Sequence, residues 1–242
     1  MQDRARPPYR SGSWGRLQYM CTVNGPPDPA DLAGESAPVI SASIRPVSAD
    51  TRYYARRQVI MNTTVFVFHP SLEGSSRVNK KLSDAARQIG LDVRDMYMIY
   101  PDFRIDIKRE QEVLTHTDRI VLQFPMYWYS TPALLKQWED DVLEYGWAYG
   151  STGTALRGKE LIVAVSPGGS GDDYVHGSGK NYTVTDLLRP LQATSNLIGT
   201  KYIKPFITAG ASGMTDGEAA RKAQEYVEYI TRGQLEALGA YE

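Results

Sequence analysis

The chain has 242 residues, of which 42% are hydrophobic and 23% charged. This composition is ordinary for a folded protein and excludes a wholly disordered, collagen-like or coiled-coil chain. Its 27 basic and 28 acidic residues give a net charge of -1, which argues against a nucleic-acid-binding protein. No apolar run approaches the roughly 20 residues that cross a bilayer. Because the single cysteine, Cys21, cannot form a disulfide within the chain, we expect a cytoplasmic protein, and we expect no metal site.

The composition changes near residue 60. Residues 1–60 contain 7 of the 14 prolines and no lysine, and they show no sustained strand or helix period. Such a segment cannot bury enough apolar surface to offset the entropy that it loses on ordering. We therefore expect residues 1–60 to be a disordered extension, with a transit or regulatory role as the alternative. Residues 61–242 are expected to form the folded domain.

Strand and helix patterns alternate through this domain. Residues 64–68, Thr-Val-Phe-Val-Phe, form a short run of β-branched and aromatic residues, which is typical of a buried strand. Residues 71–75 form a polar loop, and residues 78–89 carry apolar side chains at helical spacing, with Ser76 as the expected N-cap. Similar patterns predict further strands over residues 91–98, 119–124, 160–166 and 202–208. They predict further helices over residues 107–115, 132–143, 183–198 and 216–238.

The alternation predicts an α/β fold with a parallel sheet, because parallel neighbours are joined by right-handed crossover helices that cover both faces. A domain of about 180 residues suits a doubly wound, five-stranded sheet of flavodoxin-like type, with strand order 2-1-3-4-5. In such sheets ligands bind outside the carboxyl ends of the strands. We therefore expect the functional residues in the loops after the first, third and fourth strands.

These three loops offer different chemistry. Residues 69–79 place hydroxyl and N–H groups at a helix N-terminus, which suits a phosphate, although an ordinary capped helix has the same pattern. Residues 127–129, Tyr-Trp-Tyr, offer an aromatic surface to a planar ligand or to a subunit interface. Residues 166–179 contain a glycine pair that a ligand can approach closely, or they form only a flexible connection. No complete Walker A motif occurs, which argues against a P-loop phosphate site. No complete nucleophile elbow occurs either, which argues against a serine hydrolase.

Residues 123–138, Gln-Phe-Pro-Met-Tyr-Trp-Tyr-Ser-Thr-Pro-Ala-Leu-Leu-Lys-Gln-Trp, closely resemble the hallmark of the NAD(P)H:quinone reductase (DT-diaphorase-like) family of flavodoxin-fold proteins. Shorter matches to the family occur in the same order, and they begin at His69, Asn79, Pro167 and Leu188. Members of this family bind FAD or FMN without a covalent bond and pass two electrons from NAD(P)H to a quinone. The resemblance implies the same activity for this chain.

The resemblance also implies roles for individual residues. The phosphate and ribityl part of the flavin would be held by His69, Ser76, Val78 and Asn79. The isoalloxazine ring would be flanked by Pro125, Met126, Tyr127, Trp128 and Tyr129. Backbone groups at the polar edge of the ring would belong to Pro167, Gly168 and Gly169. The two expected catalytic residues, which would help with the negative charge of the reduced ring, are Tyr174 and His176. His176 lies earlier in its loop than the family's histidine, and Lys180 is closer to that spacing.

We therefore expect a homodimeric flavoprotein that passes two electrons from NAD(P)H through FAD or FMN to a quinone or a similar acceptor. The choice between FAD and FMN stays open, because residues 69–79 form a longer loop than in mammalian members. A rival prediction is a regulatory subunit that docks on a membrane transporter, since relatives resemble the ancillary proteins of glutathione-gated potassium efflux systems. A one-electron carrier is disfavoured, because such carriers usually have a strongly acidic surface.

Overall fold

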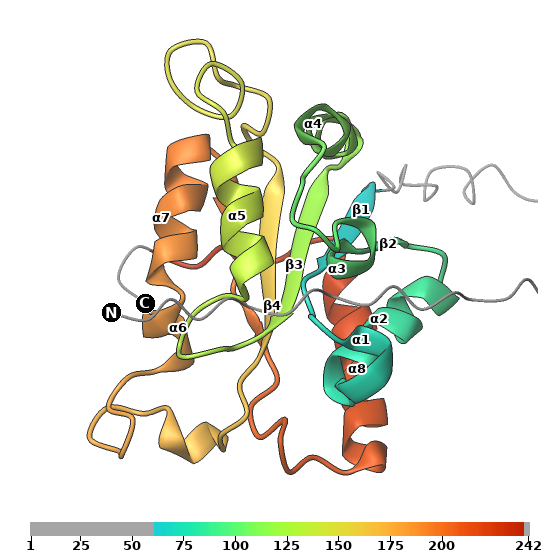
Figure 1. Cartoon of the computed structure of the whole chain (residues 1–242). Helices are drawn as coiled ribbons and strands as arrows, with labels where there is room; N and C mark the ends of the chain where they lie inside the picture. The colour runs from blue at the N-terminus through green and yellow to red at the C-terminus, as the bar shows by residue number, and fades with distance from the viewer. Residues whose placement is uncertain (1–60, 240–242) are drawn as a thin grey trace, which may run out of the picture. The chain divides into compact units, whose positions relative to one another are not determined.

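A six-stranded parallel sheet lies at the centre of the computed structural model, which describes residues 61–239 (Figure 1). Its strands follow the order β2-β1-β3-β4-β5, and β6 also pairs with β4. The strands are β1 (Thr63–Val67), β2 (Asp92–Asp95), β3 (Arg119–Pro125), β4 (Glu160–Ser166), β5 (Lys201–Tyr202) and β6 (Phe206–Ile207). This arrangement confirms the predicted α/β fold and its flavodoxin-like strand order. The expectation of disorder for residues 1–60 falls outside the described residues.

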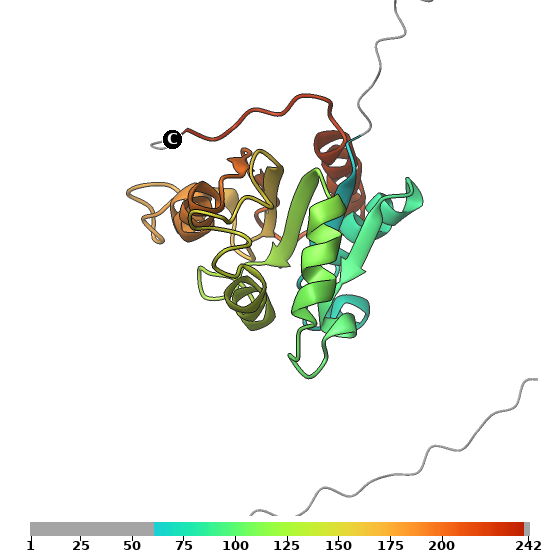
Figure 2. The same ribbon diagram turned by 90° about the horizontal axis from the view of Figure 1, so that it is seen from above.

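Helices cover both faces of the sheet (Figures 1 and 2). The helices are α1 (Leu72–Ser75), α2 (Val78–Gln88), α3 (Met96–Ile99), α4 (Ile107–His116), α5 (Ala133–Val142), α6 (Val184–Leu187), α7 (Arg189–Ile198) and α8 (Asp216–Ile230). One face packs against α2 and α8, and the other packs against α4, α5 and α7. Within residues 61–239, no helix is both long and apolar enough to cross a membrane.

Strand β1 contributes side chains to the hydrophobic cores on both faces of the sheet, because successive residues of a strand point to opposite faces. Val65 and Val67 pack with the helices α2 and α8, whereas Phe66 and Phe68 face the opposite side. There both phenylalanine rings contact Trp138 of α5, with ring centroids 5.5 and 5.8 Å apart. The continuous apolar run in the sequence therefore reflects burial on both faces, as parallel sheets require.

A buried carboxylate holds α4 and α5 in place on this second face. Glu110 of α4 is fully buried and accepts hydrogen bonds from Tyr100 Oη, at 2.7 Å, and from Trp138 Nε1, at 3.0 Å. It also pairs with the Arg94 guanidinium of β2. Charge and hydrogen-bond partners together satisfy a carboxylate that burial alone would strongly disfavour.

Several element boundaries differ from the sequence-based prediction. The expected strand over residues 91–98 ends at Asp95, because the Asp95 carboxylate accepts the Met98 N–H and caps α3. The expected loop over residues 71–75 contains α1 instead. The expected helix over residues 183–198 is divided into α6 and α7 at Leu188, just before Pro190.

The C-terminal elements are also shorter than predicted. The expected strand over residues 202–208 is split into β5 and β6. Ile203 N donates to Leu161 O of β4 at 2.9 Å, but the next residue whose N–H would face β4 is Pro205, which has none. The expected helix over residues 216–238 ends at Ile230. Beyond it the chain runs antiparallel to β5, where Leu238 N donates to Tyr202 O at 2.8 Å. Edge pairing with β5 therefore overrides the helical periodicity of these last residues.

Candidate active site

A cavity of about 460 Å³ lies at the carboxyl ends of the strands β1, β3 and β4. Its volume is within the range of small-molecule sites, about 300–1,000 Å³. It is lined by His69, Ser75, Ser76, Arg77, Val78, Asn79, Pro125, Met126, Tyr127, Ser166, Gly168, Ala211 and Ser212. The cavity therefore lies where a doubly wound sheet is expected to bind its ligand.

The first wall of the cavity is the start of α2. This helix begins at Val78 with Arg77 at the N-cap position, and no side-chain cap is found there in the described part of the chain. The predicted N-cap, Ser76, is thus one residue too early, and its Oγ accepts the Lys80 N–H at 3.1 Å. Arg77 Nη1 is held by Met214 O at 2.6 Å. The first turn presents positive helix-end charge to the cavity, which favours an anion.

His69 adds a neutral donor beside this helix end. Its Nδ1 accepts the Ser71 N–H at 3.1 Å, so the ring proton lies on Nε2. Burial lowers the pKa of His69, and the nearby Asp95 opposes this shift only in part. At neutral pH the imidazole is therefore uncharged, with its Nε2–H available to a ligand.

The floor of the cavity is a chain of buried amides and one hydroxyl. Asn79 Nδ2 donates to Ser166 Oγ at 2.7 Å, and Gln123 Nε2 donates to Asn79 O at 2.8 Å. All three side chains are buried. Gln123 Oε1 has no hydrogen-bond partner within residues 61–239. The floor is thus fixed by buried mutual hydrogen bonds, and Gln123 itself is not among the residues that line the cavity.

The opposite wall is a pair of loops joined by backbone hydrogen bonds. The carbonyl groups of residues 167–169 accept from the N–H groups of Ala211, Ser212 and Gly210, at 3.0, 3.4 and 2.6 Å respectively. These hydrogen bonds fix the glycine loop against residues 210–212. A Cβ atom at Gly168 would lie only 2.6 Å from Ser212 Oγ. Any larger residue at this position therefore requires the Ser212 hydroxyl to move.

The aromatic segment forms a strained turn at the rim. Tyr127 and Ser130 exchange two backbone hydrogen bonds of 3.0 and 2.9 Å, so that Trp128 and Tyr129 form a two-residue loop. Both have positive φ, 48° and 63°, in the left-handed region that such turns normally fill with Asn and Gly. The Trp128 side chain is 92% exposed. Strain of about 1–3 kcal/mol per residue is typical of functional positions.

Beyond the glycines, Tyr174 and His176 lie in different surroundings. Tyr174 is buried, which raises the pKa of its hydroxyl, while Lys180 nearby lowers it in part. His176 is mostly exposed, and its Nε2 lies 2.8 Å from Asp186 Oδ2. The Asp186 pKa falls to about 2, because Thr183 donates to the carboxylate and His176 contributes as well.

The structure brings together most of the residues expected from the sequence. Those that line the cavity are His69, Ser76, Val78, Asn79, Pro125, Met126, Tyr127 and Gly168. Those that lie in the surrounding loops are Trp128, Tyr129, Pro167, Gly169, Tyr174 and His176. Sequence reasoning missed the cavity residues Arg77, Ser166, Ala211 and Ser212. The carboxyl-end rule, applied also to the last strand, would have identified Ala211 and Ser212.

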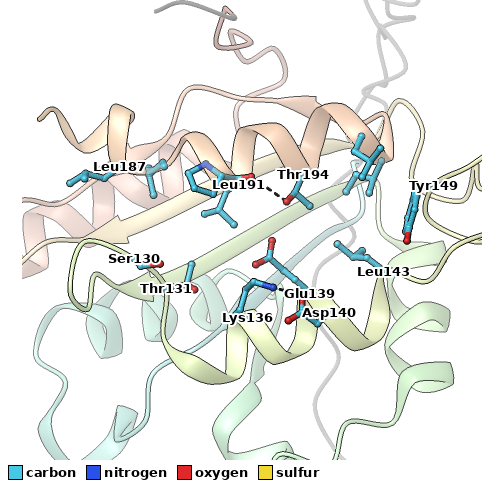
Figure 3. Close-up of a pocket in the computed structure, with 14 residues that line it drawn as sticks. Ser130, Thr131, Lys136, Glu139, Asp140, Leu143, Tyr149, Leu187, Leu191 and Thr194 are labelled. Atoms are coloured by element: carbon cyan, nitrogen blue, oxygen red, sulfur yellow. Dashed lines mark hydrogen bonds and ion pairs between the residues drawn. The ribbon is translucent and has the colours of Figure 1, made fainter.

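A second cavity of about 350 Å³ forms a groove between α5 and α7 (Figure 3). Leu143, Leu191 and Ile198 contribute apolar walls. The Glu139 carboxyl points from α5 toward α7. Burial raises the pKa of Glu139 to about 7, although Lys136 opposes the shift. Lys136 is engaged in an ion pair with Asp140.

Glu139 makes the stability of the fold depend on pH. The pKa of this carboxyl is about 7 in the fold, against an ordinary value of 4.5. Its stabilising contribution is therefore present below pH 4.5 and is lost as the pH rises through 7. After allowance for partial exposure, we expect the free energy of unfolding to fall by about 1–2 kcal/mol over this range. Urea unfolding of Glu139→Gln near pH 5 and pH 8 should show this fall abolished. The exposed Glu112→Gln is the matched control and should retain it; an unchanged profile for Glu139→Gln would contradict the assignment.

A sequence model of the flavodoxin-like fold family matches residues 61–230. The chain belongs to this family. It is 47% identical over 171 residues to the uncharacterised NAD(P)H oxidoreductase YrkL of Bacillus subtilis strain 168. This match covers 70% of this chain and 98% of YrkL. It is 40% identical to KefF of Salmonella schwarzengrund, an ancillary protein of a glutathione-regulated potassium-efflux system, over 69% of this chain and 93% of KefF.

Two solved structures in this fold are also similar. General stress protein 14 of Treponema denticola, in complex with FMN, shares 38% identity over 72% of this chain and 99% of its own, with a TM-score of 0.68. An NADPH-quinone reductase from P. pentosaceus shares 31% identity over 71% of this chain and 98% of its own, with a TM-score of 0.63. Residues 61–230, which the family model matches, include all the residues that line the cavity.

Proposed function

We propose that the chain is an NAD(P)H:quinone oxidoreductase that uses a non-covalently bound flavin. The observation that carries this proposal is the cavity at the carboxyl ends of the strands, where the N-terminal end of α2 and a glycine loop lie beside an aromatic turn. The names of the similar proteins, an NAD(P)H oxidoreductase and an NADPH-quinone reductase, support the same activity.

The residues of the cavity suit a flavin. The start of α2, with Ser76 and His69, fits a phosphate group, since it combines helix-end charge with hydroxyl and imidazole donors. Tyr127 and the N–H groups of Gly168 and Gly169 fit the face and the polar edge of a planar ring. When bound, the flavin supplies two-electron transfer between NAD(P)H and an acceptor.

In the proposed activity, the chain's own groups bind and orient the flavin. The floor made by Asn79 and Ser166, which Gln123 supports through Asn79 O, fixes the depth of the ligand, because its hydrogen bonds are internal and buried. The Tyr174 hydroxyl, with its raised pKa, stays protonated and available as a donor. We propose FMN as the physiological flavin, because a similar protein, general stress protein 14 of Treponema denticola, was crystallised with FMN.

We also propose a cytoplasmic homodimer. The apolar groove between α5 and α7 and the exposed Trp128 side chain both favour a contact with a second copy. In such a dimer the strained turn of one copy would lie near the site of the other. Sedimentation equilibrium should give twice the mass of the chain at micromolar concentration, and a monomer would contradict the dimer.

Steady-state kinetics test the proposed function. With NADPH and a water-soluble naphthoquinone, the FMN-loaded protein should give the parallel double-reciprocal lines of ping-pong turnover. Trp128→Ala should lower quinone kcat/KM by about tenfold, since an aromatic anchor of this kind is worth about 1.4 kcal/mol or more. Tyr145→Ala is the control, because this exposed tyrosine follows the other end of α5. Unchanged turnover in Trp128→Ala with full FMN content would count against the proposal.

The similarity to KefF supports a second proposal, in which the same fold docks on a potassium-efflux transporter. Purification of the tagged chain from detergent-solubilised membranes distinguishes the two proposals. Recovery of such a transporter in stoichiometric amount supports docking, whereas recovery of the chain alone contradicts it.

A further inference from the structure

We propose that Lys180, and not His176, supplies the positive charge at the polar edge of the flavin site. This inference rests on the proposed function, since it concerns the same cavity. It assigns a role to a residue in the loop that follows the glycine pair.

The position of Lys180 is set by three contacts. Its Nζ lies 5.5 Å from the ring centroid of Tyr174 and 3.7 Å from Asp173 Oδ2. Its Cε lies 3.0 Å from the point that a Cβ of Gly169 would occupy. The side chain is only 28% exposed. The lysine therefore lies folded back against the glycine loop and does not extend into solvent.

The surroundings of His176 suit a different role. The imidazole is 72% exposed, and its Nε2 contacts Asp186 Oδ2 at 2.8 Å. Asp186 in turn accepts from the N–H and the Oγ1 of Thr183 in the capping box of α6. His176 thus completes the N-terminal cap of a helix. Neither His176 nor Lys180 lines the cavity itself, but Lys180 packs against Gly169, the residue next to the lining Gly168.

Lys180 and Tyr174 act on the cavity as a pair. Gly168, which lines the cavity, directly precedes the glycine against which both side chains pack. The ammonium is partly neutralised by Asp173, and the buried phenol remains a hydrogen-bond donor. A fixed positive charge in this partly buried place favours additional negative charge at the glycine edge. Removing it should make reduction of a bound flavin less favourable.

The midpoint potential of bound FMN tests this assignment. In Lys180→Met the equilibrium constant for two-electron reduction, measured anaerobically against a reference dye with excess FMN, should fall about tenfold, which corresponds to a potential about 30 mV lower. Lys180→Arg keeps the charge and should stay close to the parent protein. His176→Gln should also leave the potential unchanged.

Binding measurements separate this inference from the proposed function. If Lys180→Met binds oxidised FMN normally but reduced FMN about tenfold more weakly, the assignment is supported. If it weakens both forms equally, or if His176→Gln alone lowers the potential, the assignment is wrong while the flavoprotein proposal stands. If the parent protein binds neither form of FMN, the proposed function itself fails.

Discussion

Replacing Glu110 with alanine lowers the free energy of unfolding by about 3–5 kcal/mol, the usual loss when one partner of a buried ion pair is removed. The carboxylate is fully buried and is shared by Arg94, Tyr100 and Trp138. Without it the Arg94 guanidinium, which already has one nitrogen without a partner among the described residues, keeps its charge in the core. Urea unfolding followed by circular dichroism measures the change.

The neighbouring Glu112 provides the control for this experiment. It lies on the same helix, pairs with Arg109 at 2.7 Å, and both side chains are more than half exposed. Exposed pairs contribute about 0–1 kcal/mol, so Glu112→Ala should be nearly neutral. Equal losses for the two alanine variants would show that the Glu110 cluster does not hold α4 and α5 to the sheet.

Replacing Gly168 with valine should weaken FMN binding by about 100-fold, or about 2.7 kcal/mol. A Cβ at Gly168 would lie 2.6 Å from Ser212 Oγ, and rotation of the Ser212 side chain can remove this clash. The two further methyl groups of valine would also need space, and we expect them to push into the cavity wall. Fluorescence titration of the flavin-free protein with FMN measures the affinity.

Gly213→Val tests whether the effect belongs to the cavity. A Cβ at Gly213 meets no atom within 4 Å, and the residue has no positive φ. It lies in the same loop as Ser212 but does not line the cavity. FMN affinity should therefore be unchanged in this variant. Normal FMN binding by Gly168→Val would place the flavin elsewhere.

The fold could be predicted where burial alone determines the structure. The apolar runs that became β1, β3 and β4 are buried on both faces, and no competing interaction alters them. The edge elements were predicted less well. At Asp95 a single capping carboxylate ends β2, and near β5 the pairing of Leu238 with Tyr202 replaces helix. These contacts join residues far apart in sequence or depend on one side chain, so periodicity does not reveal them.

The sequence could predict those site residues that lie in loops directly after a strand. Residues such as His69, Asn79 and Tyr127 come directly after or near strand ends, and they line the cavity as expected. Ser212 reaches it through backbone hydrogen bonds to the glycine loop, which no local pattern encodes. The different surroundings of His176 and Lys180 likewise depend on how their loop folds back, so sequence spacing alone could not distinguish their roles.

Anaerobic titration of the FMN-loaded protein with NADPH tests the central claim most directly. One equivalent of NADPH per bound FMN should bleach the visible absorption band of the oxidised flavin, and a quinone added afterwards should restore it. A protein that retains no FMN after incubation and gel filtration, or whose bound FMN stays oxidised with excess NADPH and NADH, would contradict the account.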